Sequence, residues 1–270
     1  MKQTLAVIGV GNMAKAILNG IFFTKSELFS NFVLFDQNKA QCEEFASRSR
    51  VRVASSISDT IRDADFVMLA VKPQNYPEVL AELSACPDHS KKIYISIAAG
   101  ITVDDVSKAL SEACVVRVLP NVPMLIGQGV SLVCRNNRVA PADFETVCSA
   151  FRSAGSVILI DEEEMNRMIG VTSSSPAYIF RLIQAIADGA KAQGLERDDL
   201  IDAICDVVIG SAMLLKSSKD TPNALIQKVA SKGGTTEKAL EQLSLGQLEK
   251  IVENAMVACT KRADELGQKS

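Results

Sequence analysis

Short apolar runs alternate with helical patterns over the first part of the chain. The apolar runs are rich in β-branched residues and have the length of single strands, at residues 4–10, 31–36, 51–54, 65–71 and 92–98. Between them, apolar residues recur with the spacing of amphipathic helices, at residues 13–23, 39–48, 58–64 and 75–85. Strand–helix alternation of this kind predicts a parallel sheet with helices on both faces.

The strand pattern continues to Ile160 and then stops. Further strands are predicted at residues 113–119, 129–134 and 156–160, with a helix at 141–154 between the last two. We therefore expect the sheet to end near Ile160.

Beyond Asp161 the pattern is helical throughout. Long stretches with helical apolar spacing occupy residues 174–193, 198–218 and 246–266. The acidic residues 161–164 mark the predicted boundary and suit the first turn of a helix, where the helix dipole favours negative charge. Two domains are predicted, an α/β domain at residues 1–160 and an all-α domain at residues 161–270.

One of these helices is apolar on nearly every side. Residues 203–215 carry few polar side chains, and a helix of this kind must be buried all round. A bundle of this size has little interior, so a partner subunit is expected to cover the helix.

Composition and charge narrow the functional class. The net charge is −3 and the 29 basic residues are scattered, so nucleic acid is not an expected partner. The apolar runs of the first domain are too short to span a membrane, and the chain passes from Met1 directly into a strand pattern without a secretory signal. These features predict a cytoplasmic protein that acts on a small-molecule substrate.

Cysteine and histidine exclude several kinds of catalysis. The seven cysteines are far apart and form no CxxC pair, which is typical of reduced core thiols and not of disulfides or a zinc site. The single histidine, His89, lies in a polar stretch that is predicted to be a loop. Neither a histidine-based triad nor a metal site is expected.

A glycine-rich turn follows the first predicted strand. Gly9 permits the tight turn, Gly11 allows the backbone to approach a pyrophosphate, and Ala14 allows close packing of helix on strand. Asn12 and Met13 open the helix, whose free N–H groups and dipole favour phosphate. The motif and its place predict a Rossmann-type dinucleotide-binding domain at the N-terminal side.

Asp36 ends the second predicted strand. A carboxylate at this position accepts hydrogen bonds from the adenosine ribose and favours NAD over NADP. Asn38 and Lys39 follow and could donate to a 2′-phosphate, and Asp36 could also be a simple strand-end residue. The choice between NAD(H) and NADP(H) therefore stays open.

A second candidate for cofactor binding follows the fourth predicted strand. Ala70, Val71, Lys72 and Pro73 lie at a carboxyl strand end, where ligands bind in open α/β sheets. Pro73 fixes the turn. Lys72 could face a phosphate or a carboxylate, or it could be a surface lysine in a turn.

Several motifs, in order along nearly the whole chain, resemble the pyrroline-5-carboxylate reductase family. They are GVGNMA at 9–14, LAVKP at 69–73, SIAAGIT at 96–102, RVLPNVP at 117–123, SSSPAYIF at 173–180, ADGAKAQGL at 187–195 and ASKGGTTEKAL at 230–240. The resemblance implies NAD(P)H-dependent reduction of 1-pyrroline-5-carboxylate to L-proline, the last step of proline biosynthesis. It favours NADP(H) and adds Ala99 to the cofactor-binding residues.

The loop at residues 231–236 is the expected substrate site. Its glycines expose successive N–H groups ahead of a helix, which suits a carboxylate, although an ordinary turn with a Thr helix cap would look similar. By resemblance, the substrate carboxylate binds backbone groups of this loop, and the Thr236 hydroxyl meets the ring nitrogen as the catalytic group. The implied substrate-binding residues are Ser175, Ser231, Gly233, Gly234, Thr235 and Thr236.

Two departures from the family pattern keep alternatives open. Ser173 stands where the family usually has glycine, and Lys232 stands where it often has proline. A regulatory relative that binds nucleotide without turnover is one alternative. A β-hydroxyacid dehydrogenase is the other, although that class usually relies on a lysine that residues 166–175 lack.

The resemblance also bears on assembly. It implies a homodimer built by the helices after Asp161, or a ring of such dimers. It further implies that the catalytic cleft lies between one subunit's Rossmann domain and helices shared across the dimer.

Overall fold

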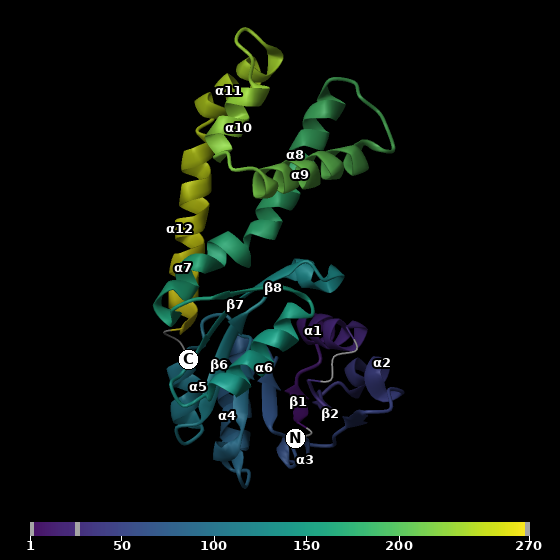
Figure 1. The fold of residues 1–270 in the computed structure, drawn as a ribbon, viewed down its shortest axis with the longest axis vertical. Helices are drawn as coiled ribbons and strands as arrows, with labels where there is room; N and C mark the ends of the chain where they lie inside the picture. The colour runs from purple at the N-terminus through teal and green to yellow at the C-terminus, as the bar shows by residue number, and fades with distance from the viewer. Residues whose placement is uncertain (1–2, 25–27, 268–270) are drawn as a thin grey trace. The chain divides into compact units, whose positions relative to one another are not determined.

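A computed structural model describes residues 3–24 and 28–267 of the chain. In these residues eight strands form one sheet in the order β3-β2-β1-β4-β5-β6-β7-β8. The strands are β1 (Thr4–Ile8), β2 (Asn31–Phe35), β3 (Val51–Val53), β4 (Phe66–Leu69), β5 (Ile93–Ser96), β6 (Cys114–Leu119), β7 (Gly129–Arg135) and β8 (Gly155–Leu159). This order, with β1 beside β4 at the reversal point, is that of a Rossmann-type sheet, and the predicted fold class is confirmed (Figure 1).

The sheet is not parallel throughout. Strands β1 to β6 are parallel, whereas β7 runs antiparallel to β6 and β8 runs parallel to β7. The connection from β6 to β7, residues 120–128, holds only the short 3₁₀ helix η4 (Val122–Ile126). A connection without a crossover helix cannot return the chain to the same end of the sheet, so β7 runs back along β6.

Alternate strand residues face opposite sides of the sheet, and each side has its own hydrophobic core. In β1, Leu5 and Val7 belong to one core, and Ala6 and Ile8 to the other. Residues of α1 (Asn12–Phe23), α2 (Glu43–Ala46) and α6 (Pro141–Arg152) pack into the first core. Residues of α3 (Ile57–Ile61), α4 (Tyr76–Ser84), α5 (Val103–Ala109) and α7 (Glu162–Thr172) pack into the second.

The chain divides into two compact units. Unit 1 contains the sheet and reaches Ser174, and it also includes the chain from Ala258 onward; unit 2 is Ser175–Val257. The strands end at Leu159, close to the predicted end of the sheet, but the compact unit continues through α7 because Met165 and Ile169 are buried in its core. The compact units thus do not coincide with the predicted division between residues 160 and 161.

Unit 2 is helical. It contains α8 (Ser175–Ala192), α9 (Leu200–Ser217), α10 (Pro222–Val229) and α11 (Thr235–Leu245), and it includes the first part of α12 (Leu248–Gly267). Two helices had no counterpart in the predicted pattern, α5 and α10. Both are short and begin with a threonine cap, Thr102 and Thr221, whose hydroxyl accepts a backbone hydrogen bond. Within the described ranges, no helix has the length and apolar character needed to cross a bilayer.

Candidate active site

The turn between β1 and α1 is built on Gly9. This glycine has φ +89°, a conformation that other residues rarely adopt. A Cβ at Gly9 would lie 2.9 Å from the backbone C and O atoms of Ala70. The turn therefore packs directly against the residue that follows β4, and only glycine permits this approach.

Gly11 has a different role from Gly9. Its backbone is extended, it caps the N-terminus of α1, and a Cβ placed on it would meet no described atom within 4 Å. The space in front of Gly11 is thus open to a ligand. Asn12 and Met13 form the first turn of α1, and Ala14 is buried against the sheet, as helix–strand packing requires.

The Asp36 carboxylate lies against this turn. Its Oδ2 accepts a hydrogen bond from the Val10 N–H at 2.7 Å, and its Oδ1 accepts one from the Asn38 N–H at 2.9 Å. The side chain therefore connects the end of β2 to the glycine turn. A carboxylate oxygen accepts more than one hydrogen bond, so Asp36 keeps capacity for a ribose hydroxyl.

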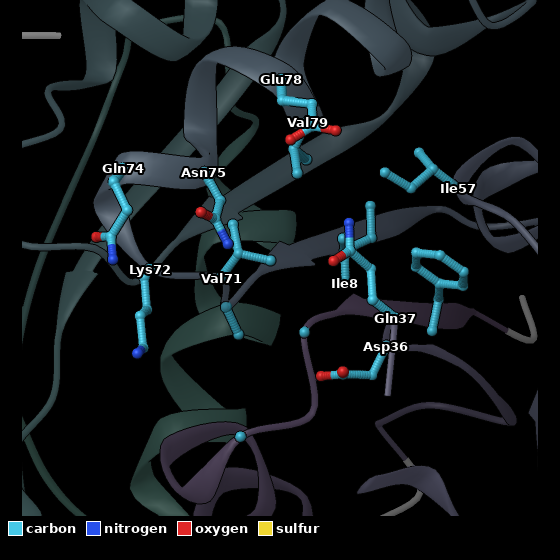
Figure 2. A pocket seen from close by; sticks show the side chains of 14 residues that line it. Ile8, Asp36, Gln37, Ile57, Val71, Lys72, Gln74, Asn75, Glu78 and Val79 are labelled. Atoms are coloured by element: carbon cyan, nitrogen blue, oxygen red, sulfur yellow. The ribbon is translucent and has the colours of Figure 1, made fainter. Parts of the chain in front are cut away.

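Gly9, Gly11 and Asp36 line one pocket of about 390 Å³ at the carboxyl ends of β1, β2 and β4 (Figure 2). The predicted cofactor residues that line it are Gly9, Gly11, Asp36, Ala70, Val71 and Lys72. Five others do not line it: Asn12, Met13 and Ala14 of α1, Pro73, which opens the 3₁₀ helix η2 (Pro73–Asn75), and Ala99, which follows β5.

The pocket also contains residues that the sequence patterns did not single out. Ile57 and Val79 are buried apolar residues, and Gln37, Asn75 and Glu78 add polar groups around them. An apolar floor with a few convergent polar groups is typical of a nucleotide site. These residues could have been found from their positions, because all of them follow a strand end or lie in the first turn of the next helix.

In unit 2, the loop before α11 is organised by its two glycines. Gly233 has φ +75°, and its N–H donates to Oε2 of Glu237 at 2.8 Å. A Cβ on Gly234 would lie 2.7 Å from Oγ of Ser231, so the loop closes tightly on itself. Thr235 and Thr236 begin the helix, where the first N–H groups have no partner within the helix and favour an anion.

The segment that joins α7 to α8 accommodates the first departure from the family pattern. Ser173 has φ −81°, in the right-handed region, so its side chain causes no backbone strain. Ser174 Oγ lies 3.2 Å from Sγ of Cys259, and Ser175 is the first residue of α8. Lys232, the second departure, is exposed. The Ser173 hydroxyl is buried and has no hydrogen-bond partner among the described residues.

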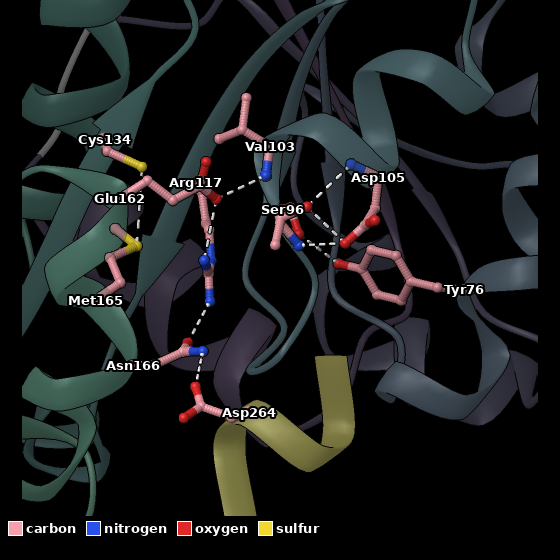
Figure 3. Close-up of polar contacts among 11 residues, drawn as sticks. Tyr76, Ser96, Val103, Asp105, Arg117, Cys134, Glu162, Met165, Asn166 and Asp264 are labelled. Carbon is pink, nitrogen blue, oxygen red and sulfur yellow. Dashed lines mark hydrogen bonds and ion pairs between the residues drawn. The ribbon is translucent and has the colours of Figure 1, made fainter. Parts of the chain in front are cut away.

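A buried arginine connects α7 to the sheet and to α12 (Figure 3). Arg117 on β6 is almost fully buried, and it donates to Oε1 of Glu162 at 3.0 Å and to Oδ1 of Asn166 at 3.1 Å. Asn166 in turn donates to Oδ1 of Asp264 at 2.9 Å. Asn166 lies in the segment where a β-hydroxyacid dehydrogenase would place catalytic groups. In this protein its side chain forms structural contacts.

The other predicted residues lie away from these features. His89 begins the 3₁₀ helix η3 (His89–Lys91) before β5, with Nδ1 2.8 Å from the Cys86 carbonyl oxygen and Nε2 3.2 Å from Oγ of Ser111. All seven cysteines are free thiols. No group of three or more His, Cys, Asp or Glu side chains suited to a metal ion occurs in the part of the chain that the structure describes.

The Rossmann-type sheet, the glycine turn with its pocket and the helical C-terminal part define an NAD(P)-dependent oxidoreductase. Two family models match the chain. Residues 4–100 match the NADP oxidoreductase, coenzyme F420-dependent family, and residues 162–266 match pyrroline-5-carboxylate reductase dimerisation.

Comparisons over the full length agree with this class. The chain is 31% identical to pyrroline-5-carboxylate reductase of Escherichia coli, across 99% of this chain and 100% of that one. The Streptococcus pyogenes enzyme has a structure with a TM-score of 0.88 and 28% identity, covering 98% and 99% of the two chains. The Plasmodium falciparum pyrroline carboxylate reductase, solved with NADP bound, has a TM-score of 0.86 and 25% identity, with 98% of each chain covered. The chain belongs to the pyrroline-5-carboxylate reductase family.

Proposed function

We propose that this protein reduces 1-pyrroline-5-carboxylate to L-proline with NAD(P)H, the last step of proline biosynthesis. The observation that carries the proposal is the family relationship over 99% of the chain, together with intact dinucleotide and carboxylate loops. The two alternatives, a regulatory relative without turnover and a β-hydroxyacid dehydrogenase, have no comparable support.

The cofactor is held by the pocket of unit 1. The fit is supported by the open space in front of Gly11 and by the free N–H groups at the start of α1. The glycine turn would hold the pyrophosphate, and Asp36, Ile57 and Val79 would hold the adenosine. When bound, the reduced nicotinamide supplies the hydride, and the protein supplies position and electrostatics.

The substrate is held by the loop before α11. Its carboxylate accepts hydrogen bonds from the N–H groups of Thr235 and Thr236, where the helix dipole adds favourable charge. The Gly234 N–H, which was also expected to bind the carboxylate, instead donates to the Ser231 carbonyl at 2.9 Å. Ser231 and Gly233 shape the loop, and Ser175 lies at the start of α8. The reaction adds a hydride to the imine carbon and leaves one proton on the ring nitrogen, which the Thr236 hydroxyl contacts.

The direct test is an assay of the purified protein. We expect oxidation of NADPH that depends on pyrroline-5-carboxylate, followed by loss of absorbance at the nicotinamide band, with L-proline as the product. NADPH should be preferred, as the family resemblance implies. Because the Asp36 carboxylate disfavours a 2′-phosphate, NADH should also support turnover. Dinucleotide binding without any turnover would instead support the regulatory alternative.

We propose that residues 161–270 form a dimerisation and substrate-binding domain and that the active protein is at least a homodimer. Most large apolar residues of unit 2 are exposed in the single chain; examples are Val207 at 67%, Met213 at 66% and Val257 at 62%. Apolar surface of this extent is expected to be buried against a second copy. Gathering of dimers into a ring is part of the same proposal.

Assembly is tested by sedimentation at assay concentration. We expect no stable monomer, because an isologous interface through α9 and α12 would bury the residues just named in both subunits. Met213→Glu should shift the protein toward monomer, since an unpaired buried charge opposes association. Lys216→Glu on the same helix is the control. It changes the charge at a site that is already polar and should leave the assembly unchanged. A stable and active wild-type monomer would contradict the proposal.

Mixed oligomers test whether one catalytic cleft is built from one chain or from two. Gly11→Val removes the cofactor site and Thr236→Ala removes the catalytic hydroxyl, so neither variant alone should be fully active. If the glycine turn and the Thr236 loop of one cleft come from different chains, mixing the two variants should restore part of the activity. The absence of restoration in a proven mixed dimer would mean that each cleft is built from one chain.

We also propose that the protein works in the cytoplasm. The support is the set of seven free cysteines, which is typical of a reducing compartment.

A further inference from the structure

A tyrosine side chain connects two strand ends at the edge of the cofactor pocket. Tyr76 is the first residue of α4, and it is 1% exposed. Its hydroxyl donates to the carbonyl oxygen of Leu69, the last residue of β4, at 2.8 Å. The same hydroxyl lies 3.0 Å from Oγ of Ser96, the last residue of β5, which is also fully buried (Figure 3).

The contacts continue from Leu69 to the phosphate-binding turn. The Leu69 carbonyl also accepts the Ile97 N–H at 3.3 Å, so β4 and β5 are joined at the point where both strands end. The next residue, Ala70, donates to the Ile8 carbonyl at 2.9 Å. Ala70 also lies in the direct contact with Gly9 that excludes a side chain there. A shift of Leu69 would therefore move Ala70 and, with it, the glycine turn.

The hydroxyl is a permanent hydrogen-bond donor. Burial raises the pKa of Tyr76 far above its ordinary value, so the group stays protonated wherever the protein is folded. The bond to Leu69 is therefore constant across the pH range of any assay, and the Tyr76 oxygen accepts a hydrogen bond from the Ser96 hydroxyl.

We propose that Tyr76, together with Ser96, is a positioning residue for dinucleotide binding. It holds the carboxyl ends of β4 and β5 so that residues 70–72 and the Gly9 turn keep the geometry that the cofactor requires. The proposal rests on the proposed use of NAD(P)H. It assigns no contact between Tyr76 and the cofactor or between Tyr76 and the substrate. Its consequence is that the loss of one buried hydroxyl weakens cofactor binding while the chemical step is retained.

Tyr76→Phe tests the proposal, and Tyr94→Phe is the matched control. Tyr94 is equally buried, and its hydroxyl donates to the His89 carbonyl at 3.0 Å, but it lies near the beginning of β5, away from the pocket. Each variant loses one buried hydroxyl, so both should show a similar fall in melting temperature. Tyr76→Phe alone should raise the Kd and KM for NADPH roughly three- to tenfold, with kcat changed less than about twofold.

Ser96→Ala and the double variant Tyr76→Phe/Ser96→Ala test whether the two hydroxyls act as a pair. Residues that act as one unit show non-additive effects, so the double variant should bind NADPH about as weakly as Tyr76→Phe alone. Equal Kd values for Tyr76→Phe and Tyr94→Phe would overturn the inference. Dinucleotide binding is measured by titration without substrate, so it is independent of turnover. A wild-type protein that bound neither dinucleotide would overturn the proposed function as well as this inference.

Discussion

Replacing Gly11 by valine is expected to weaken dinucleotide binding at least about a hundredfold, which corresponds to roughly 2.7 kcal/mol. The reason is steric. The Cβ position of Gly11 faces open space at the pocket, and this is where the pyrophosphate must approach the backbone. The branched side chain would fill that space. Titration with NADPH and NADH measures the loss directly.

The fold itself should tolerate this valine. No described atom lies within 4 Å of the new Cβ, and the backbone of Gly11 is extended, so the cost is that of a poorer helix cap, about 1 kcal/mol. Gly9→Ala is the contrasting variant, because φ +89° and the 2.9 Å approach to Ala70 make any side chain there destabilising. A Gly11→Val protein that keeps native dinucleotide affinity would show that the phosphates bind elsewhere.

Thr236→Ala is expected to lower kcat roughly ten- to a hundredfold. General acid assistance is typically worth about 10²–10⁴-fold, and an imine that arrives protonated needs less of it. Thr236 lies in the first turn of α11, and in the proposed mechanism its hydroxyl contacts the ring nitrogen. Steady-state rates with saturating substrate and cofactor measure the change.

Thr236→Ser is the matched control. It keeps a hydroxyl at the same position in the helix and should stay within a few-fold of the wild-type kcat. Neither variant should alter NADPH affinity or the melting temperature, because the Thr236 side chain is partly exposed and the loop is held by the Glu237 carboxylate, which accepts the Gly233 N–H. An unchanged kcat in Thr236→Ala would remove this hydroxyl from the mechanism.

Local patterns of apolar residues in the sequence were sufficient to predict most strands and helices of the fold. The strands are identified by their β-branched apolar runs, because the sheet has a hydrophobic core on each side, and the long helices are identified by their apolar spacing. The reversal at β7 was not predicted, since it depends on how the chain crosses residues 120–128. The short helices α5 and α10 were not predicted, because seven and eight residues are too few for an apolar repeat to stand out, although each begins with a threonine cap.

The site was predictable where backbone conformation restricts the residue type. Gly9 and Gly233 both have positive φ, and their motifs mark that requirement. The hydrogen bond from Val10 to Asp36 could not be deduced, because it depends on the side-chain direction at the end of β2. The contact between Tyr76 and Ser96 joins residues from different strand–helix units, and no local pattern encodes such a pairing.

The end of α12 has a consequence for how the protein is made. Ala263 lies in the core of unit 1, and Asp264 binds Asn166 of α7. A ribosome completes the eight strands long before it reaches residue 258, and nascent domains fold as their segments emerge. The sheet unit therefore keeps an uncovered apolar patch until all of unit 2 has been translated. Chains that stop before residue 258 would retain that patch, which chaperones and proteases can recognise, so unit 1 closes only after α12 has been made.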